Sequence, residues 1–138
     1  MNFQQVSADD MGLKYAFAPL TEKSVRAYGS SLSVSTKNSV NICRAIKGMN
    51  ILKGKKLLEN LISQKESLDG KYYSNAALEI LNTLKSAESN AEFKGLDSER
   101  LIIHASAHKG FTFFRPRRMK MRRDKKKVTN IQIVLIQK

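Results

Sequence analysis

The chain is poor in cysteine, proline and acidic residues, and it has no tryptophan. Its single cysteine, Cys43, excludes an internal disulfide framework, and its helical spacing from Val40 and Ile46 indicates a small buried hydrophobe rather than a nucleophile. No apolar run approaches the roughly 18 residues of a membrane-spanning helix, so we expect no membrane partner. The first residues lack the basic start and apolar run of a secretory signal, which predicts a reducing, cytosolic location.

Basic residues outnumber acidic ones by 25 to 12, which gives a formal net charge of +13 and an isoelectric point near 10.0. Charge of one sign at this density attracts polyanions, and nucleic acid is the first candidate. With 41% hydrophobic residues the chain can still bury a core, and its length predicts one domain over residues 1–138.

Most of the net charge lies in residues 109–127, which include ten basic residues and one acidic residue, Asp124. Sequences typical of β-strands flank this stretch over residues 101–114 and 128–137, so it predicts a hairpin with a basic loop. Alternation predicts that each arm has one apolar face that covers the helices, formed by Leu101, Ile103, Ala105 and Ala107 on the first arm and by Ile131, Ile133 and Leu135 on the second. We call residues 108–127 the finger. At ~3.3 Å per residue the finger would project roughly 30 Å from the body. Because an isolated two-stranded ribbon is marginal in water, we expect it to need a partner.

The alternative for such a basic run is a solvated, disordered loop or a nuclear import signal. Arginine predominates toward the tip, where a planar guanidinium can pair with phosphate through two hydrogen bonds and can stack on bases. Apolar side chains among the charges favour an ordered element: Phe111, Phe113, Phe114, Pro116, Met119 and Met121.

The rest of the chain predicts a body over residues 25–107 and 128–138, preceded by an extended arm over residues 1–24. The expected anchors of the arm are Tyr15, Phe17 and Pro19. A first strand is expected over 25–34, then three helices: 36–47, capped by Ser35 and ended by Gly48; one starting after Asn50; and 74–94, capped by Ser74 and ended by Gly95. An Asp69-Gly70 turn joins the last two. Strand, helices and hairpin in this order predict an α+β layer architecture.

Two sequence patterns resemble known phosphate-binding and zinc-binding sites but do not match them fully. Residues 48–56 resemble a phosphate-binding P-loop, but five residues instead of four separate the glycines and Lys56 stands where a Mg²⁺-binding hydroxyl belongs, so a surface turn is the better interpretation. His104 and His108 have the spacing of a helical zinc site, but in a strand they would lie roughly 13 Å apart. We therefore expect no metal, and His108 becomes a candidate donor to a phosphate.

Three lysines, Lys53, Lys55 and Lys56, lie in the opening turns of the second helix, where the helix dipole is already positive. This placement suggests an external anion. No Ser–His–Asp grouping or paired carboxylates stand out, so we expect neither an enzyme nor a cofactor.

The end of the expected third helix contains a specific sequence motif. Residues 84–97 read LKSAESNAEFKGLD, which resembles the signature of the universal large-subunit ribosomal protein twenty-two family, called seventeen in the eukaryotic cytosol, and the NAEFKGLD part resembles its archaeal and eukaryotic branch. CRAIKG at 43–48 resembles the family's first helix, and FRPR at 114–117 resembles the start of its hairpin tip. The matches run over about residues 14–137.

The resemblance implies three helices on a three-stranded antiparallel sheet with a long hairpin. It also implies a structural protein of the large ribosomal subunit, with the hairpin threaded between rRNA segments and lining the nascent-peptide exit tunnel. The implied partners are large-subunit rRNA, neighbouring large-subunit proteins and, as a further contact, the nascent polypeptide; no homo-oligomer is expected.

Charge pattern and resemblance together give the expected site residues. The tunnel-lining tip would comprise Arg117, Arg118, Met119, Lys120 and Met121. The residues expected to bind rRNA are Lys37, Arg44, Lys47, Lys53, Lys55, Lys56, Asn90, Lys94, His108, Lys109, Arg115, Arg117, Arg118, Lys120, Arg122, Arg123, Lys125, Lys126 and Lys127.

The chain departs from the family pattern in two places. Arg117 to Met121 replace the small residues that usually ease the turn of the tip, and a long basic segment between the second and third helices shrinks to about residues 66–73. The chain thus looks like a trimmed member. The runner-up function is an architectural DNA-binding protein that uses a basic β-arm, which would predict self-association around a duplex. An RNA-modifying enzyme would need a catalytic or cofactor cluster, which the sequence does not suggest.

Overall fold

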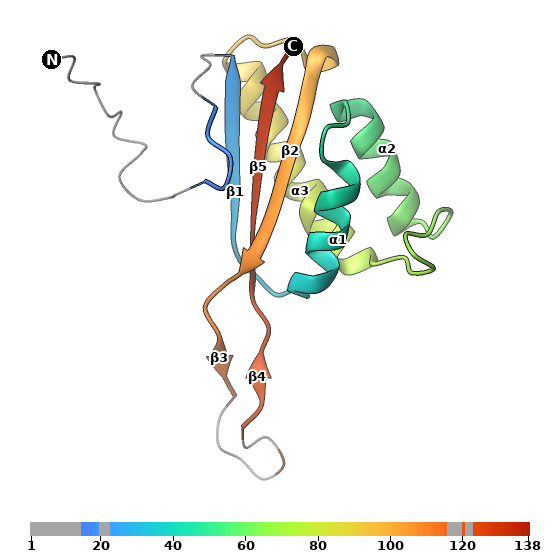
Figure 1. The fold of residues 1–138 in the computed structure, drawn as a ribbon, viewed down its shortest axis with the longest axis vertical. Coiled ribbons are helices and arrows are strands. Elements are labelled where there is room, and N and C mark those ends of the chain that lie inside the picture. The colour runs from blue at the N-terminus through green and yellow to red at the C-terminus, as the bar shows by residue number, and fades with distance from the viewer. Residues whose placement is uncertain (1–14, 20–22, 116–119, 121–122) are drawn as a thin grey trace, which may run out of the picture.

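The computed structural model describes residues 15–19, 23–115, 120 and 123–138, and Figure 1 shows the arrangement of its elements. Three helices pack on an antiparallel sheet, which confirms the predicted α+β class. No described helix is both long and apolar enough to cross a membrane. The elements are β1 (Ser24–Leu32), α1 (Thr36–Ile46), α2 (Ile51–Ile62), α3 (Ser74–Phe93), a 3-10 turn η2 (Ser98–Arg100), β2 (Leu101–Lys109), β3 (Phe113–Phe114), β4 (Lys125–Lys126) and β5 (Thr129–Gln137).

The body is built around β5, which pairs antiparallel with β1 on one side and with β2 on the other. Alternating apolar residues explain this position: Ile131, Ile133 and Leu135 point to one face and are fully buried. Their partners on β2 include Ile103, opposite Leu135, and Ala105, opposite Ile133. The predicted apolar face of the hairpin arms is therefore confirmed.

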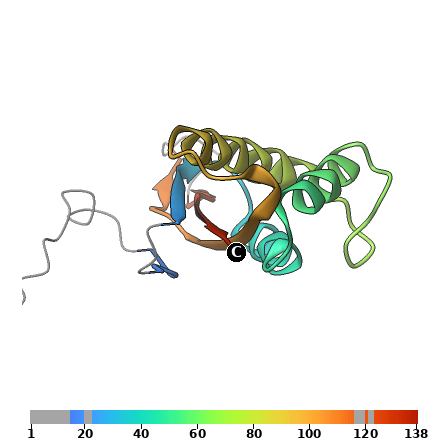
Figure 2. The same ribbon diagram turned by 90° about the horizontal axis from the view of Figure 1, so that it is seen from above.

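The helices bury their apolar faces against the sheet and against each other. The long helix α3 packs on β1, β5 and α2, while α1 packs on β2. Figure 2 shows α3 crossing one side of the sheet. Gly54 of α2 is buried against β2, where a Cβ would lie only 2.5 Å from Cδ1 of Ile103. The absence of a side chain at Gly54 lets α2 approach the sheet closely.

Two of the predicted helix caps are wrong. Ser35 precedes α1 but its hydroxyl makes no capping hydrogen bond; the Ser39 hydroxyl donates instead to the Ser35 carbonyl. Ser74 is the first residue of α3 rather than its cap, because Tyr73 before it adopts a left-handed conformation with φ of 49° and accepts the first helical hydrogen bond, from the Ala77 amide.

The other predicted helix boundaries are confirmed. Asn50 caps α2 by accepting a hydrogen bond from the Leu52 amide at 3.0 Å. Gly95 follows α3 with φ of +70°, and the Leu96 amide closes the end by donating to the Ala91 carbonyl.

The predicted turns between the helices are present. Residues 48–50 lie between α1 and α2 as a surface turn, and this turn also pairs with the edge of β2, since the Gly48 amide donates to the Ile103 carbonyl at 2.8 Å. Between α2 and α3, Leu68 and Lys71 exchange backbone hydrogen bonds across Asp69 and Gly70, both at positive φ.

Residues 15–19 lie across the sheet face that the helices leave uncovered (Figure 2). The Ala16 amide donates to the side-chain oxygen of Gln132 on β5 at 2.8 Å. Tyr15 meets Tyr28 of β1 edge-on, and Phe17 stacks on His104 of β2 at a centroid distance of 4.3 Å. Tyr15 and Phe17 thus anchor the arm as predicted, and β1 starts at Ser24, one residue earlier than expected.

Candidate nucleic-acid interface

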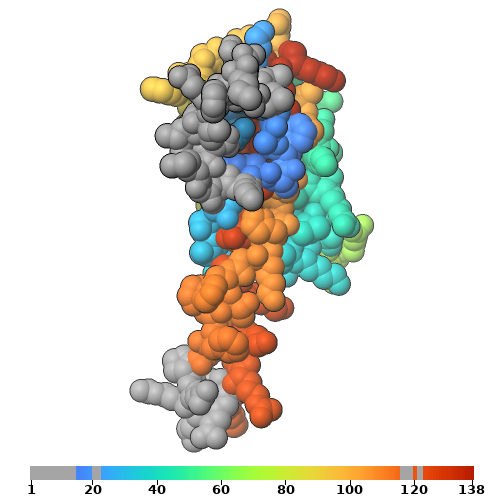
Figure 3. All heavy atoms as spheres, turned by 60° about the vertical axis from the view of Figure 1, so that its left-hand side comes forward, coloured from blue at the N-terminus to red at the C-terminus, as the bar shows by residue number. Residues whose placement is uncertain are grey.

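The finger leaves the body as a continuation of β2 and β5, and Figure 3 shows its described atoms projecting from the body. Lys109 still pairs with Thr129, so the sheet extends into the first two residues assigned to the finger. Farther out, Phe113 and Phe114 pair with Lys126 and Lys125, which confirms the predicted hairpin. The Arg115 amide then donates to the Asp124 carbonyl at 3.0 Å.

A bulge separates the two ladders of the ribbon. The Gly110 amide donates to the Val128 carbonyl at 2.9 Å, and the next cross-strand pair joins Phe113 to Lys126. Phe111 and Thr112 therefore lie opposite a single residue, Lys127. Two residues opposite one is the arrangement of a β-bulge, which bends a ribbon and increases its twist. Nothing in the sequence indicated this bulge.

The finger exposes its aromatic side chains. Phe111 is 75% exposed, Phe114 69% and Phe113 48%. The rings of Phe111 and Phe113 also contact each other edge-to-face, with their centroids 5.4 Å apart. In a body of this size such residues are normally buried. Aromatic rings on a ribbon without a core are suited to stacking on flat partners such as nucleic-acid bases.

Cationic side chains surround these rings. The ammonium group of Lys125 lies 5.5 Å from the centre of the Phe114 ring, within the range of a cation–π contact. The described cations of the finger are exposed: Lys109, Arg115, Lys120, Arg123, Lys125, Lys126 and Lys127. Arg117, Arg118, Met119 and Met121 of the expected tip lie outside the described residues, as does Arg122, another expected rRNA contact.

Three residues expected at the interface have partners within the body. The Asn90 amide group donates to the Arg26 carbonyl at 3.3 Å, and the Lys94 ammonium group donates to the Ser24 carbonyl at 3.2 Å, so both tie α3 to β1. Lys55 forms an ion pair with Glu88, which joins α2 to α3. Sequence spacing could not reveal these contacts because each one links residues more than 30 positions apart.

Other expected residues are exposed. Lys37, Arg44 and Lys47 line the outside of α1 and its end, and Lys53 and Lys56 lie on the outside of α2. The Asn50 side chain already occupies one free amide at the start of α2, and Lys55 already has Glu88, so less of that helix start is available to an external anion than the sequence suggested.

The two histidines lie on the same face of β2 without forming a metal site. Among the described residues there is no group of three or more His, Cys, Asp or Glu side chains that could hold a metal ion. Burial and the nearby Lys47 charge lower the pKa of His104, whose Nδ1 is buried and has no hydrogen-bond partner among the described residues. His108 is exposed at the base of the finger, with its Nε2 3.4 Å from the side-chain nitrogen of Asn130.

Cys43 is 3% exposed in the core, which confirms its predicted role as a buried hydrophobe. Burial raises the pKa of its thiol to about 12, so the reactive thiolate is scarce at neutral pH.

Comparison with known proteins agrees with this architecture. The profile of the family described as ribosomal protein L22p/L17e matches residues 27–136. The protein named large ribosomal subunit protein uL22 from Archaeoglobus fulgidus is 37% identical over 119 residues, covering 71% of this chain and 77% of its own length. Its namesake from Methanococcus aeolicus is 33% identical over 123 residues, covering 75% and 80%.

The matched region includes all three helices, most of the three-stranded sheet and the finger, so the similarity concerns nearly the whole fold and not a single motif. The archaeal relatives agree with the branch that the NAEFKGLD wording suggests. The chain therefore belongs to the ribosomal protein L22p/L17e family, a family of structural ribosomal proteins and not of enzymes.

Proposed function

We propose that this ribosomal protein is a structural constituent of the large subunit, that it binds large-subunit rRNA, and that its finger lines the nascent-peptide exit tunnel. The observation that carries the proposal is the finger itself: a basic ribbon with three exposed phenylalanines, projecting from a body that already has a complete core. Neither its charge nor its aromatic surface serves the fold of the body. Both suit a partner made of phosphates and bases.

Electrostatics would supply most of the affinity. Lys and Arg side chains of the finger neutralise phosphates and release the counterions condensed on them. Contacts with phosphates carry no sequence information, so rRNA shape would decide where the finger fits. The exposed cations of α1, Lys37, Arg44 and Lys47, would hold the body against the same RNA.

The tip is proposed to reach the tunnel. Arg117, Arg118, Met119, Lys120 and Met121 would contact rRNA there, and the nascent polypeptide as well. Neighbouring large-subunit proteins would contact the body, and the chain would act as one copy per subunit in the cytosol.

Sedimentation tests this proposal first. Lysate from cells that express the chain with a small tag is separated on a sucrose gradient, before and after a high-salt wash of the ribosomes. We expect the chain in large-subunit and polysome fractions under both conditions, because a finger threaded through folded rRNA cannot leave by ion exchange alone. Release by salt would contradict the threaded finger.

The same gradient distinguishes the architectural alternative. A protein that clamps DNA with its β-arm would follow chromatin and be absent from polysomes. RNase treatment sharpens the distinction, since it would release an rRNA-bound chain and leave a DNA-bound one in place.

A further inference from the structure

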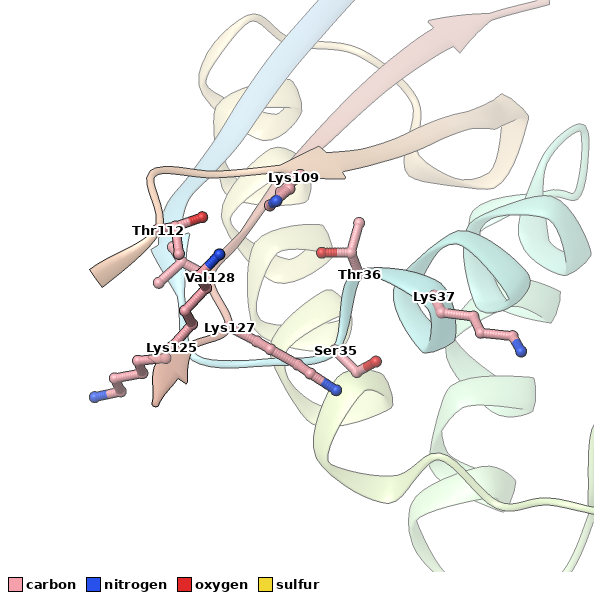
Figure 4. Close-up of a pocket in the computed structure, with 9 residues that line it drawn as sticks. Ser35, Thr36, Lys37, Lys109, Thr112, Lys125, Lys127 and Val128 are labelled. Atoms are coloured by element: carbon pink, nitrogen blue, oxygen red, sulfur yellow. The ribbon is translucent and has the colours of Figure 1, made fainter. Parts of the chain in front are cut away.

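A pocket of about 360 Å³ lies where the finger joins the body (Figure 4). Three segments that are distant in sequence form it: the start of α1, the first arm of the finger and the second arm. Among the described residues that line it, five are lysines and none is acidic. A concave site with charge of one sign repels its own walls unless an anion occupies it.

The floor of the pocket is the start of α1. The first amides of a helix have no partner within the helix, and the hydroxyl of Ser35, the N-cap residue of α1, makes no capping bond to them. The first turn also has no acidic residue. Ser35 and Thr36 both line the pocket, so the uncapped end faces it.

Two linked threonine hydroxyls connect the start of α1 to β5, next to the point where the finger begins. The Thr129 hydroxyl donates its only hydrogen to the Val34 carbonyl at 2.8 Å. The 2.8 Å contact between the Thr36 and Thr129 hydroxyls must therefore use the hydrogen of Thr36. Thr36 cannot donate from its hydroxyl into the pocket, which leaves the backbone amides and the Ser35 hydroxyl as donors there.

Both arms of the finger contribute lysines to the pocket. Lys127 is the one residue opposite Phe111 and Thr112, and in Figure 4 its side chain extends toward Ser35. Lys109 and Thr112 line the pocket from the other arm. The cations thus come from both arms of the ribbon.

We propose that this pocket binds one phosphate group, held by the first amides of α1, Ser35, Lys127 and Lys109, and that in the ribosome this group is a phosphodiester of the rRNA backbone. The last step rests on the proposed function. Since the pocket joins α1 to both arms at the bulge, a bound phosphate fixes the direction of the finger relative to the body.

Inorganic phosphate tests the pocket without RNA. The full-length chain, labelled with ¹⁵N, is titrated with phosphate and followed by two-dimensional NMR. We expect saturable shifts of the Thr36 and Lys37 amides, and at least about tenfold weaker binding in the double variant Lys109→Ala, Lys127→Ala, which loses two charge-assisted hydrogen bonds.

The matched control removes two other lysines. Lys65 and Lys71 are exposed in the connection between α2 and α3, so Lys65→Ala, Lys71→Ala changes the net charge equally and leaves the pocket intact. Shifts that spread over the chain without saturating, and that are equal in both double variants, would mean an adventitious ion only and would overturn the inference. Circular dichroism confirms that both variants are folded.

A transcript of large-subunit rRNA tests the assignment to RNA. We expect the pocket variant to lower the slope of log K against log salt by about one more than the control does, as loss of one phosphate contact predicts. Equal slopes for the two variants would limit the pocket to free phosphate and overturn the rRNA assignment. If the unmodified chain fails to bind the transcript at all, the proposed function fails, while the phosphate titration still decides the pocket.

Discussion

The body and the finger use apolar residues in opposite ways. In the body, side chains such as Ile42, Ile80 and Leu84 are fully buried, and the core is continuous from the sheet through all three helices. In the finger none of the described side chains is buried, and Phe111 is 75% exposed. One chain therefore combines a body that folds by burying its apolar side chains with a finger whose apolar side chains remain exposed for contact with a partner.

Charged groups differ in the same way. In the body, Lys55 pairs with Glu88, and Lys94 donates to a carbonyl of β1, so cations support the fold. In the finger, Lys125 lies over an exposed ring and Lys127 lines an open pocket. Substitutions in the two regions should therefore affect different measurements.

The largest effect is expected from reversing the charge of the finger tip. Replacing Arg117, Arg118 and Lys120 together with Glu puts three carboxylates where phosphates would approach, so we expect loss of stable incorporation into large subunits. The described core is formed by residues outside the finger, so thermal unfolding of the body should change little. Incorporation is measured by gradient sedimentation in cells that depend on the variant, and unfolding by circular dichroism.

The matched control for the tip variant reverses Lys65, Lys71 and Lys85, three exposed lysines of the body that are not among the expected rRNA contacts. It has the same net charge but an unchanged finger, so incorporation should be impaired less. Normal ribosome levels and unchanged translation with the tip variant would contradict the proposed role of the finger in binding rRNA.

The second prediction concerns burial. Leu84→Ala should lower the free energy of unfolding by about 2–5 kcal/mol, because the Leu84 side chain is fully buried in α3 and its truncation leaves a cavity. Phe114→Ala should change it by less than about 0.5 kcal/mol, since the ring is 69% exposed. Urea denaturation followed by circular dichroism measures both. A Phe114 variant as unstable as the Leu84 variant would show that the finger supports the core.

These differences were predictable from sequence wherever they depend on periodicity. The apolar spacing of residues 131–135 predicted the buried face of β5, and Asn50 and Gly95 marked helix ends correctly, because such signals act over a few neighbouring residues. The basic run with its phenylalanines likewise predicted the finger.

One local backbone conformation and the contacts between distant residues were not predictable. Ser74 was expected to cap α3, but the left-handed Tyr73 before it moves the cap by one residue. Asn90 and Lys94 were assigned to RNA, whereas both donate to carbonyls of β1. The pocket needs α1 and both arms of the finger in place, so no single stretch of sequence indicates it.

A smaller effect is expected from the ion pair that joins α2 to α3. Glu88→Gln keeps the shape of the side chain and removes its charge, so we expect a loss of about 0.5–1 kcal/mol in the free energy of unfolding. Lys55→Met with Glu88→Gln completes a double-mutant cycle, which isolates the pair. The coupling energy should fall as salt is added, whereas a salt-independent value would mean that packing and not charge connects the two helices.

The smallest effect is expected from His104, which lies on the outer face of the body under Phe17. Burial and Lys47 lower its pKa in the folded chain from the ordinary value of 6.5, so between the lowered value and 6.5 the unfolded chain binds more protons than the folded one. Stability contributed by the neutral ring should therefore be complete above pH 6.5 and decline as the pH falls below it. His104→Leu removes this titration, and the difference in free energy of unfolding between the two chains, measured by urea denaturation from pH 5 to 8, isolates it from the carboxylates. If this difference in the free energy of unfolding does not change with pH, protonation of His104 does not destabilise the folded body.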